Sequence, residues 1–150
     1  MSAVVTIRGR EFKPFISEER IREAVKGMAR KMDQELKDKF PLFLVVLNGS
    51  FMFAADLLRE ISVPCEVSFI KVASYQGTSS SGTINELVGL SEEISGRNVV
   101  IIEDIVDSGL TVEKLASLLN ERKAGSVRVA TALFKPGSFK RAFAIDYVGF

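Results

Sequence analysis

The sequence predicts an α/β fold in three layers, with helices on both faces of a parallel sheet. Two continuous apolar runs, Leu42–Leu47 and residues 99–102, have the length and composition of strands that are covered on both faces. Each run leads through a short glycine-containing turn into a segment of helical length. Strands that alternate with helices in this way are typical of parallel sheets.

The clearest helix signal lies in the first third of the chain. Ser17 is expected to cap this helix, since serine is a preferred N-cap residue. The next two residues, Glu18 and Glu19, are favourable at the positive end of the helix dipole. Pro41 ends the segment. Five apolar residues recur at helical spacing and are expected to form its buried stripe: Ile21, Val25, Met28, Met32 and Leu36.

The later elements follow in chain order. They are a strand at Leu42–Leu47, a helix at Phe51–Glu60, a strand at Val67–Val72, a Gly/Ser/Thr-rich loop at Ala73–Thr83, a returning strand at Ile84–Val88, a turn at Gly96–Asn98, a strand at Val99–Glu103, a helix from about Leu110 to Arg122 and a strand at Ser126–Phe134. No internal repeat or long linker divides the chain, so residues 1–150 are expected to form one domain.

The composition excludes several classes of protein. A net charge of +1 offers no overall basic field for nucleic acid, and the longest apolar run is too short to span a bilayer. Cys65 is the only cysteine, which fits a reducing compartment, and we expect a cytoplasmic protein. The sequence has no histidine, so an enzyme with this sequence would use a carboxylate as its general base and oxygen ligands for any metal.

The candidate chemistry lies at the carboxyl ends of the expected strands, where parallel sheets bind ligands. Three loops meet this condition: residues 48–50, residues 104–111 and the segment after Phe134. In the second loop, Gly109 permits a tight turn before a helix whose free N–H groups can bind phosphate. Glu103 and Asp104 would repel a phosphate unless they bind sugar hydroxyls or Mg²⁺, so the pattern favours a ligand shaped like ribose 5-phosphate. Read without any family comparison, the same acids could be ordinary polar residues at a strand end, with Asp107 as a helix cap.

Val99–Thr111 (VVIIEDIVDSGLT) resembles the phosphoribosyl-diphosphate signature of the type I phosphoribosyltransferases. The likeness extends from about Leu42 to Phe150. VVLNGSFMFAADL resembles the family's pyrophosphate loop, FIKVASYQGTSSSG its strand and active-site loop, and FKPGSFKRAFAIDYVGF the purine-binding segment of the hypoxanthine/guanine branch. The resemblance implies the type I phosphoribosyltransferase fold and Mg²⁺-dependent transfer of phosphoribose from phosphoribosyl diphosphate to a 6-oxopurine.

The resemblance also implies roles for individual residues. Glu103 and Asp104 would bind the ribose hydroxyls, directly or through Mg²⁺, and Asp107 would be the general base. The 5′-phosphate would be bound by Asp107, Ser108, Gly109, Leu110 and Thr111; the pyrophosphate by Leu47, Asn48 and Gly49; and the purine by Lys135. A lid would contain Lys71, Ser74 and Tyr75.

Some of these positions have plainer readings. Leu47–Gly49, where the family often has a non-proline cis peptide, could be an ordinary turn; Asn48 also stands where many relatives have lysine. Tyr75 could be a simple hydrophobic contact. Lys135 could be a surface residue, and Lys140 and Arg141 are expected to be.

The sequence stops at Phe150, whereas the family continues. The following segment supplies an aromatic residue that stacks on the purine, an aspartate near Mg²⁺ and a basic residue near pyrophosphate. We therefore expect a longer native chain, with the C-terminal part of the base-binding hood missing here. Xanthine or another base, or a non-catalytic sensor of phosphoribosyl diphosphate, remain alternatives. A homo-oligomer, dimer or tetramer, is expected from the resemblance alone.

Overall fold

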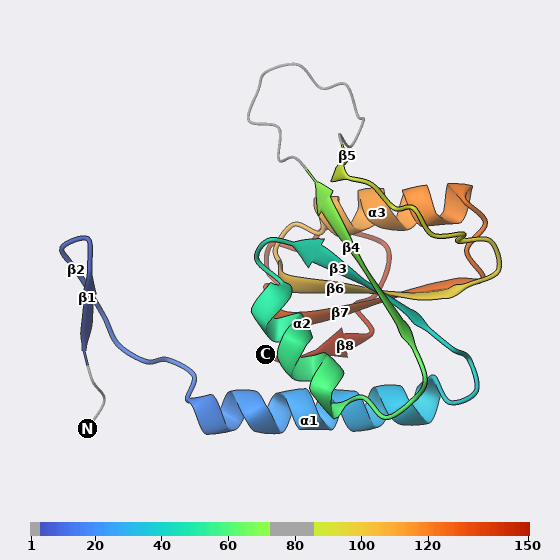
Figure 1. The fold of residues 1–150 in the computed structure, drawn as a ribbon. Helices are drawn as coiled ribbons and strands as arrows, with labels where there is room; N and C mark the ends of the chain where they lie inside the picture. Colours follow the sequence, from blue (N-terminus) through green and yellow to red (C-terminus); the bar gives the residue numbers. More distant parts are fainter. Residues whose placement is uncertain (1–3, 73–85) are drawn as a thin grey trace, which may run out of the picture.

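The computed structural model describes residues 4–72 and 86–150, which form two sheets and three helices (Figure 1). In the main sheet, β4, β3, β6, β7 and β8 run parallel in that order, and β5 lies antiparallel beside β4. The parallel α/β sheet expected from the sequence is therefore confirmed. Its strands are β3 (Leu42–Leu47), β4 (Glu66–Val72), β5 (Glu86–Val88), β6 (Asn98–Val106), β7 (Ser126–Phe134) and β8 (Tyr147–Val148).

Helices cover both faces of this sheet and make three layers. α1 (Glu18–Glu35) and α2 (Phe51–Glu60) pack on one face, where Phe43, Val45, Val100 and Ile102 point into the core. α3 (Leu110–Glu121) packs on the opposite face. Because successive strand residues point to opposite faces, the apolar runs of β3 and β6 supply both cores. Among the described residues, no helix is long and apolar enough to cross a membrane.

The expected start of α1 is confirmed, since the Ser17 side chain accepts a hydrogen bond of 3.3 Å from the Arg20 N–H. The expected stripe is correct from Val25 to Leu36, which are buried, but wrong at Ile21, whose exposed fraction is 43%. Ile21 lines a surface groove between α1 and α2 instead of the core. Helical spacing fixes the side of the helix on which a residue lies, whereas burial also requires another element to cover that turn.

β6 is longer than the strand expected at Val99–Glu103. Asn98, expected in a turn, pairs with Ser126, and the strand continues to Val106, which pairs with Phe134. Asp104, expected just after the strand, therefore lies within β6 together with Glu103. The extension follows from β7, which supplies backbone partners beyond the apolar run.

A short hairpin near the N-terminus was not expected from the sequence. β1 (Val5–Ile7) and β2 (Arg10–Phe12) form a separate two-stranded sheet, and all their residues are exposed. The turn between them has positive φ angles at Arg8 and Gly9. Three-residue strands are too short to give a clear alternating pattern in the sequence.

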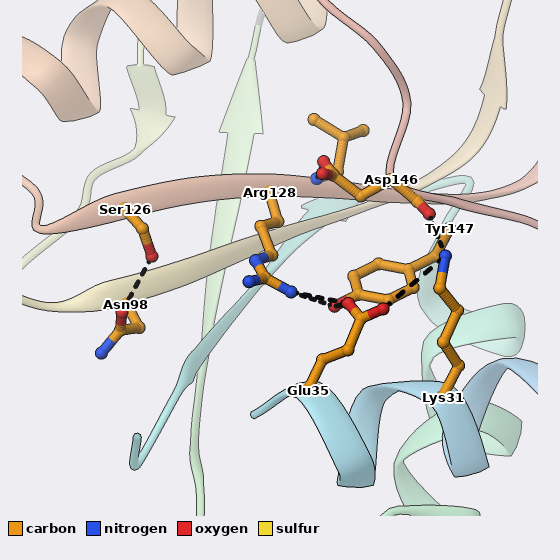
Figure 2. Close-up of polar contacts among 8 residues, drawn as sticks. Lys31, Glu35, Asn98, Ser126, Arg128, Asp146 and Tyr147 are labelled. Carbon is orange, nitrogen blue, oxygen red and sulfur yellow. Dashed lines mark hydrogen bonds and ion pairs between the residues drawn. The ribbon is translucent and has the colours of Figure 1, made fainter. Parts of the chain in front are cut away.

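β8 is held in place by a polar cluster beneath it (Figure 2). Tyr147 is buried, and its hydroxyl donates to Glu35 Oε2 at 2.8 Å while accepting from Arg128 Nη1 at 2.8 Å. Burial is the main cause that raises the pKa of Tyr147 to about 12, so the phenol stays protonated. Lys31 donates to the carbonyl oxygen of Asp146 at 3.0 Å. These contacts fix the end of the segment that begins after β7.

Candidate active site

Four parallel strands end at one edge of the sheet, and the expected site residues gather there. Leu47 at the end of β3 pairs with Lys71 near the end of β4. β3 also pairs with β6, and β6 pairs with β7 as far as Phe134, the residue before Lys135. The three loops singled out from the sequence therefore begin at neighbouring strand ends.

The loop after β3 and the acids of β6 are in direct contact. The peptide bond between Leu47 and Asn48 is cis, as expected for this loop. A Cβ atom added at Gly49 would lie 2.3 Å from Asp104 Oδ2, so the Asp104 carboxylate packs where a side chain would otherwise be. Asp104 Oδ1 also accepts from the Ile105 N–H at 2.8 Å. Only glycine permits this approach between the two loops.

Glu103 lies deeper in the site than Asp104. Its exposed fraction is 9%, and its Oε1 accepts hydrogen bonds from the Ser50 hydroxyl at 3.0 Å and from the Asp104 N–H at 3.1 Å. Burial is the largest of the causes that raise the pKa of Glu103 to about 8. At neutral pH this group therefore carries a proton and can donate as well as accept a hydrogen bond.

Ser50 lies in the candidate loop 48–50, but no role of its own was assigned to it from the sequence. It is fully buried at the start of α2, yet its side chain does not cap that helix. The hydroxyl is used by Glu103, 53 residues away in the chain. Ser50 thus connects the loop after β3 with the acidic end of β6, a link that no local pattern could have indicated.

The 107–111 loop forms the junction between β6 and α3. Gly109 is the N-cap of α3 with a φ of 81°, and it has no side chain with which to cap the helix. The reading of Asp107 as a helix cap is therefore wrong. The first N–H groups of any helix lack carbonyl partners within it, which suits this end of α3 to an anion. The Ser108 hydroxyl lies 3.4 Å from the Leu110 N–H.

Asp107 and Lys135 come together across β6 and β7. Asp107 Oδ2 lies 3.4 Å from Lys135 Nζ, and both side chains are more than half exposed. The Lys135 N–H donates to the carbonyl oxygen of Val106 at 3.0 Å, which keeps the start of the segment after β7 beside the 107–111 loop. The expected base and the expected purine-binding lysine are thus neighbours.

The remaining expected residues have different outcomes. Lys71 is half-buried near the end of β4. Ser74 and Tyr75, expected in a lid, lie outside the described residues. Lys140 is exposed as expected, but Arg141 is not a plain surface residue: its Nε donates to the Ser108 carbonyl oxygen at 3.3 Å.

The carboxylates at this edge are suited to a hard metal ion. Among the described residues, no group of three or more His, Cys, Asp or Glu side chains could hold a metal by itself. Mg²⁺ needs only one or two protein carboxylates when substrate phosphates and water complete its shell. Asp104, half-buried beside Gly49, fits that requirement together with Glu103.

Comparison with known proteins identifies the family. Residues 17–150 match the model of the phosphoribosyl transferase domain. The chain belongs to the phosphoribosyltransferase family. It is 42% identical to the hypoxanthine-guanine phosphoribosyltransferase of Bacillus subtilis, over 92% of this chain and 77% of that protein. It is 38% identical to the hypoxanthine phosphoribosyltransferase of Salmonella typhimurium, over 90% and 78% of the respective chains.

Solved structures give the same assignment. The crystal structure of a hypoxanthine-guanine phosphoribosyltransferase from Bacillus anthracis matches with a TM-score of 0.83 and 35% identity. The match covers 91% of this chain and 79% of that one. The phosphoribosyltransferase fold expected from the loop sequences is confirmed, and the protein is a transferase by family.

Proposed function

We propose that this phosphoribosyltransferase transfers phosphoribose from 5-phosphoribosyl 1-diphosphate to hypoxanthine or guanine, giving IMP or GMP and pyrophosphate. One observation carries the proposal: the glycine of the loop after β3 and the acid pair of β6 are packed against each other, beside the loop that begins α3. Such an edge can bind diphosphate, ribose and 5′-phosphate at the same time. The similarity to hypoxanthine and hypoxanthine-guanine enzymes supports the choice of base.

The phosphate groups bind to backbone. The N–H groups at the start of α3 and the hydroxyls of Ser108 and Thr111 receive the 5′-phosphate, which the positive end of the helix dipole favours. The N–H groups of residues 47–49 receive the pyrophosphate. Asn48 supplies no positive charge there, so this subsite relies on backbone more than a lysine-containing loop would.

The ribose binds to the two acids of β6. Glu103, protonated at neutral pH, donates to one ribose hydroxyl, while Asp104 accepts from the other. Mg²⁺ would be held by Asp104 and substrate oxygens, and by Glu103 once the metal has displaced its proton; when bound it would offset the negative charge of the diphosphate.

The base lies near Asp107 and Lys135. As N9 of the purine bonds to C1′, the bond from C1′ to the pyrophosphate oxygen breaks, and the proton on N7 passes to the Asp107 carboxylate. Lys135 donates to the 6-oxo group, and adenine, with a 6-amino group, lacks that acceptor. Asp107, as the general base, and Lys135, as the donor to the 6-oxo group, form an ion pair of 3.4 Å and so lie on the same side of the site.

The test is turnover of the purified intact protein with phosphoribosyl diphosphate and Mg²⁺, using hypoxanthine, guanine, xanthine and adenine separately. Pyrophosphate release and the nucleotide product are both measured. We expect turnover with hypoxanthine or guanine and none with adenine. Xanthine as the only accepted base would correct the substrate, whereas binding of phosphoribosyl diphosphate without turnover on any base would indicate a sensor.

Three further expectations belong to the same proposal. Omission of Mg²⁺ should abolish turnover. Sedimentation should give the mass of a homodimer or homotetramer. The protein should act in the cytoplasm as one catalytic domain, as its single cysteine and undivided sequence suggest.

A further inference from the structure

The segment between β7 and β8 crosses the 107–111 loop. A Cβ atom added at Gly109 would lie 2.5 Å from Phe139 Cε2 and 2.9 Å from Arg141 Cγ. Phe139 in turn packs edge-to-face against Phe134 and Phe143, with ring centroids 5.2 and 5.4 Å away. The backbone of the 107–111 loop at Gly109 is therefore in close contact with the segment between β7 and β8.

Arg141 makes two polar contacts at this crossing. Its Nε donates to the carbonyl oxygen of Ser108 at 3.3 Å, and its Nη1 lies 3.0 Å from Glu113 Oε2. Glu113 belongs to the first turn of α3. The planar guanidinium thus joins the loop before the helix to the helix itself, and only 26% of its side chain is exposed.

The contact with Ser108 has a consequence for the next N–H group. In a planar trans peptide the carbonyl oxygen and the amide hydrogen point in opposite directions. A guanidinium that holds the Ser108 oxygen therefore turns the Gly109 N–H to the other side of the loop, away from Arg141. A cationic donor on the oxygen also polarises the peptide, which makes its N–H a stronger donor to an anion.

Charge in the loop points the same way. Asp104 precedes the loop, Asp107 lies in it and Glu113 follows it, so three acids flank the proposed phosphate site in the sequence. Within the described part of the chain, two basic side chains make polar contacts with the loop: Lys135 with Asp107, and Arg141 with the Ser108 carbonyl oxygen. Lys135 is the residue proposed to bind the purine. Arg141 is therefore the basic side chain that contacts the part of the loop proposed to bind phosphate.

We infer that Arg141 is a positioning residue for the 5′-phosphate subsite: it orients the peptide between Ser108 and Gly109 and supplies positive charge to the loop from behind. It acts through the loop backbone and does not touch the substrate. The inference rests on the proposed function, since it names a determinant of the same site.

The test compares Arg141→Met, Arg141→Lys and Lys140→Met in the full chain. Lys140→Met is the matched control, because it removes a neighbouring but exposed positive charge. Arg141→Met should raise KM for phosphoribosyl diphosphate about 10- to 100-fold, as expected for loss of a charged hydrogen bond, with kcat and KM for the purine within about twofold. Arg141→Lys should recover part of the loss, since it keeps the charge but not the planar fork. Lys140→Met should match the wild type.

Binding of ribose 5-phosphate, measured by calorimetry, separates this inference from the proposed function because it needs no turnover. Arg141→Met should weaken that binding by a similar factor, while Lys140→Met should not. Wild-type protein that binds ribose 5-phosphate without turning over any base would contradict the proposed function alone. Equal binding by wild type and Arg141→Met would overturn the inference. So would a fall in thermal stability in which all kinetic constants change together, because that would mean Arg141 only holds the fold.

Discussion

The inner and the outer halves of the proposed site are built differently. In the inner half, Glu103 is buried under the Ser50 hydroxyl, and Asp104 fills the space above Gly49. In the outer half, Asp107 and Lys135 form a single ion pair with exposed side chains. Exposed ion pairs contribute about 0–1 kcal/mol, so the outer pair adds little to the stability of the fold. The inner carboxyl groups are instead enclosed: Glu103 is buried, and Asp104 Oδ2 lies where a Cβ atom at Gly49 would be.

This difference indicates how the two halves work. The ribose and diphosphate end is shaped by packing before any ligand arrives, so changes there should disturb geometry and stability. The proposed base end is held only by this exposed ion pair, so its groups would be free to pair with a purine instead. Changes there should affect the chemical step and leave the fold intact.

The largest effect is expected at the outer half. Asp107→Ala should lower kcat by about 10²- to 10⁴-fold because the proton acceptor for N7 is lost. KM for phosphoribosyl diphosphate and the thermal midpoint should remain near wild type, since the carboxylate is exposed. Steady-state kinetics and a thermal melt measure both. A large drop in the thermal midpoint would contradict the contrast between the halves.

At the inner half, Gly49→Ala should reduce kcat/KM for phosphoribosyl diphosphate by about 10²-fold. The added Cβ would displace the Asp104 carboxylate, and a shift of about 1 Å in a binding group has an effect of that order. Gly137→Ala is the control, because a Cβ atom at Gly137 would meet nothing within 4 Å and its φ is not positive. Similar kinetics for the two variants would show that the close contact does not matter.

The buried acid should give the stability of the protein a pH dependence. The pKa of Glu103 is about 8 in the folded chain and near 4.5 when unfolded, so the folded state binds the extra proton between these values. Its contribution therefore makes the free energy of unfolding fall as pH rises from 4.5 to 8. Glu103→Gln should remove this contribution, and so its advantage over wild type should grow between pH 5 and pH 8 in urea titrations with EDTA present.

Glu60→Gln, at an exposed carboxylate, serves as the control for this titration. The difference of Glu103→Gln from wild type should change with pH more steeply than that of Glu60→Gln. A Glu103→Gln variant that behaves in the same way would mean that burial does not perturb the acid.

The smallest effect is expected at Ser50. Ser50→Ala removes the hydrogen bond to Glu103 Oε1, and should lower the free energy of unfolding by about 0.5–1.5 kcal/mol. A double-mutant cycle with Glu103→Gln measures the coupling between the two side chains. A coupling energy of zero would show that Ser50 and Glu103 contribute to the stability of the fold independently of each other.

Particular residues show how far the sequence could predict the site. Strands β3 and β6 could be predicted from their apolar runs. The turns that follow them could be predicted from Asn48–Gly49 and Ser108–Gly109, because strands, turns and helix starts depend on residues that are close in the sequence. The resemblance of those loops to a known family then supplied roles. The contacts of Ser50 and Arg141 could not be predicted, because they are made with partners 53 and 33 residues away in the chain.

The strand–turn–helix order, the type of residue at each loop and the family were determined by the sequence alone. The order of elements and the residues of the loops depend on short-range effects: periodic burial, glycine at positive φ and free N–H groups at a helix start. The family follows from the likeness of those loop sequences to known ones. Tertiary structure decided that Asp104 occupies the space above Gly49, that Glu103 is buried enough to retain its proton, and that Arg141 holds the 107–111 loop. Each of these depends on which side chains the folded sheet brings within contact distance, because desolvation and close packing are properties of the assembled core.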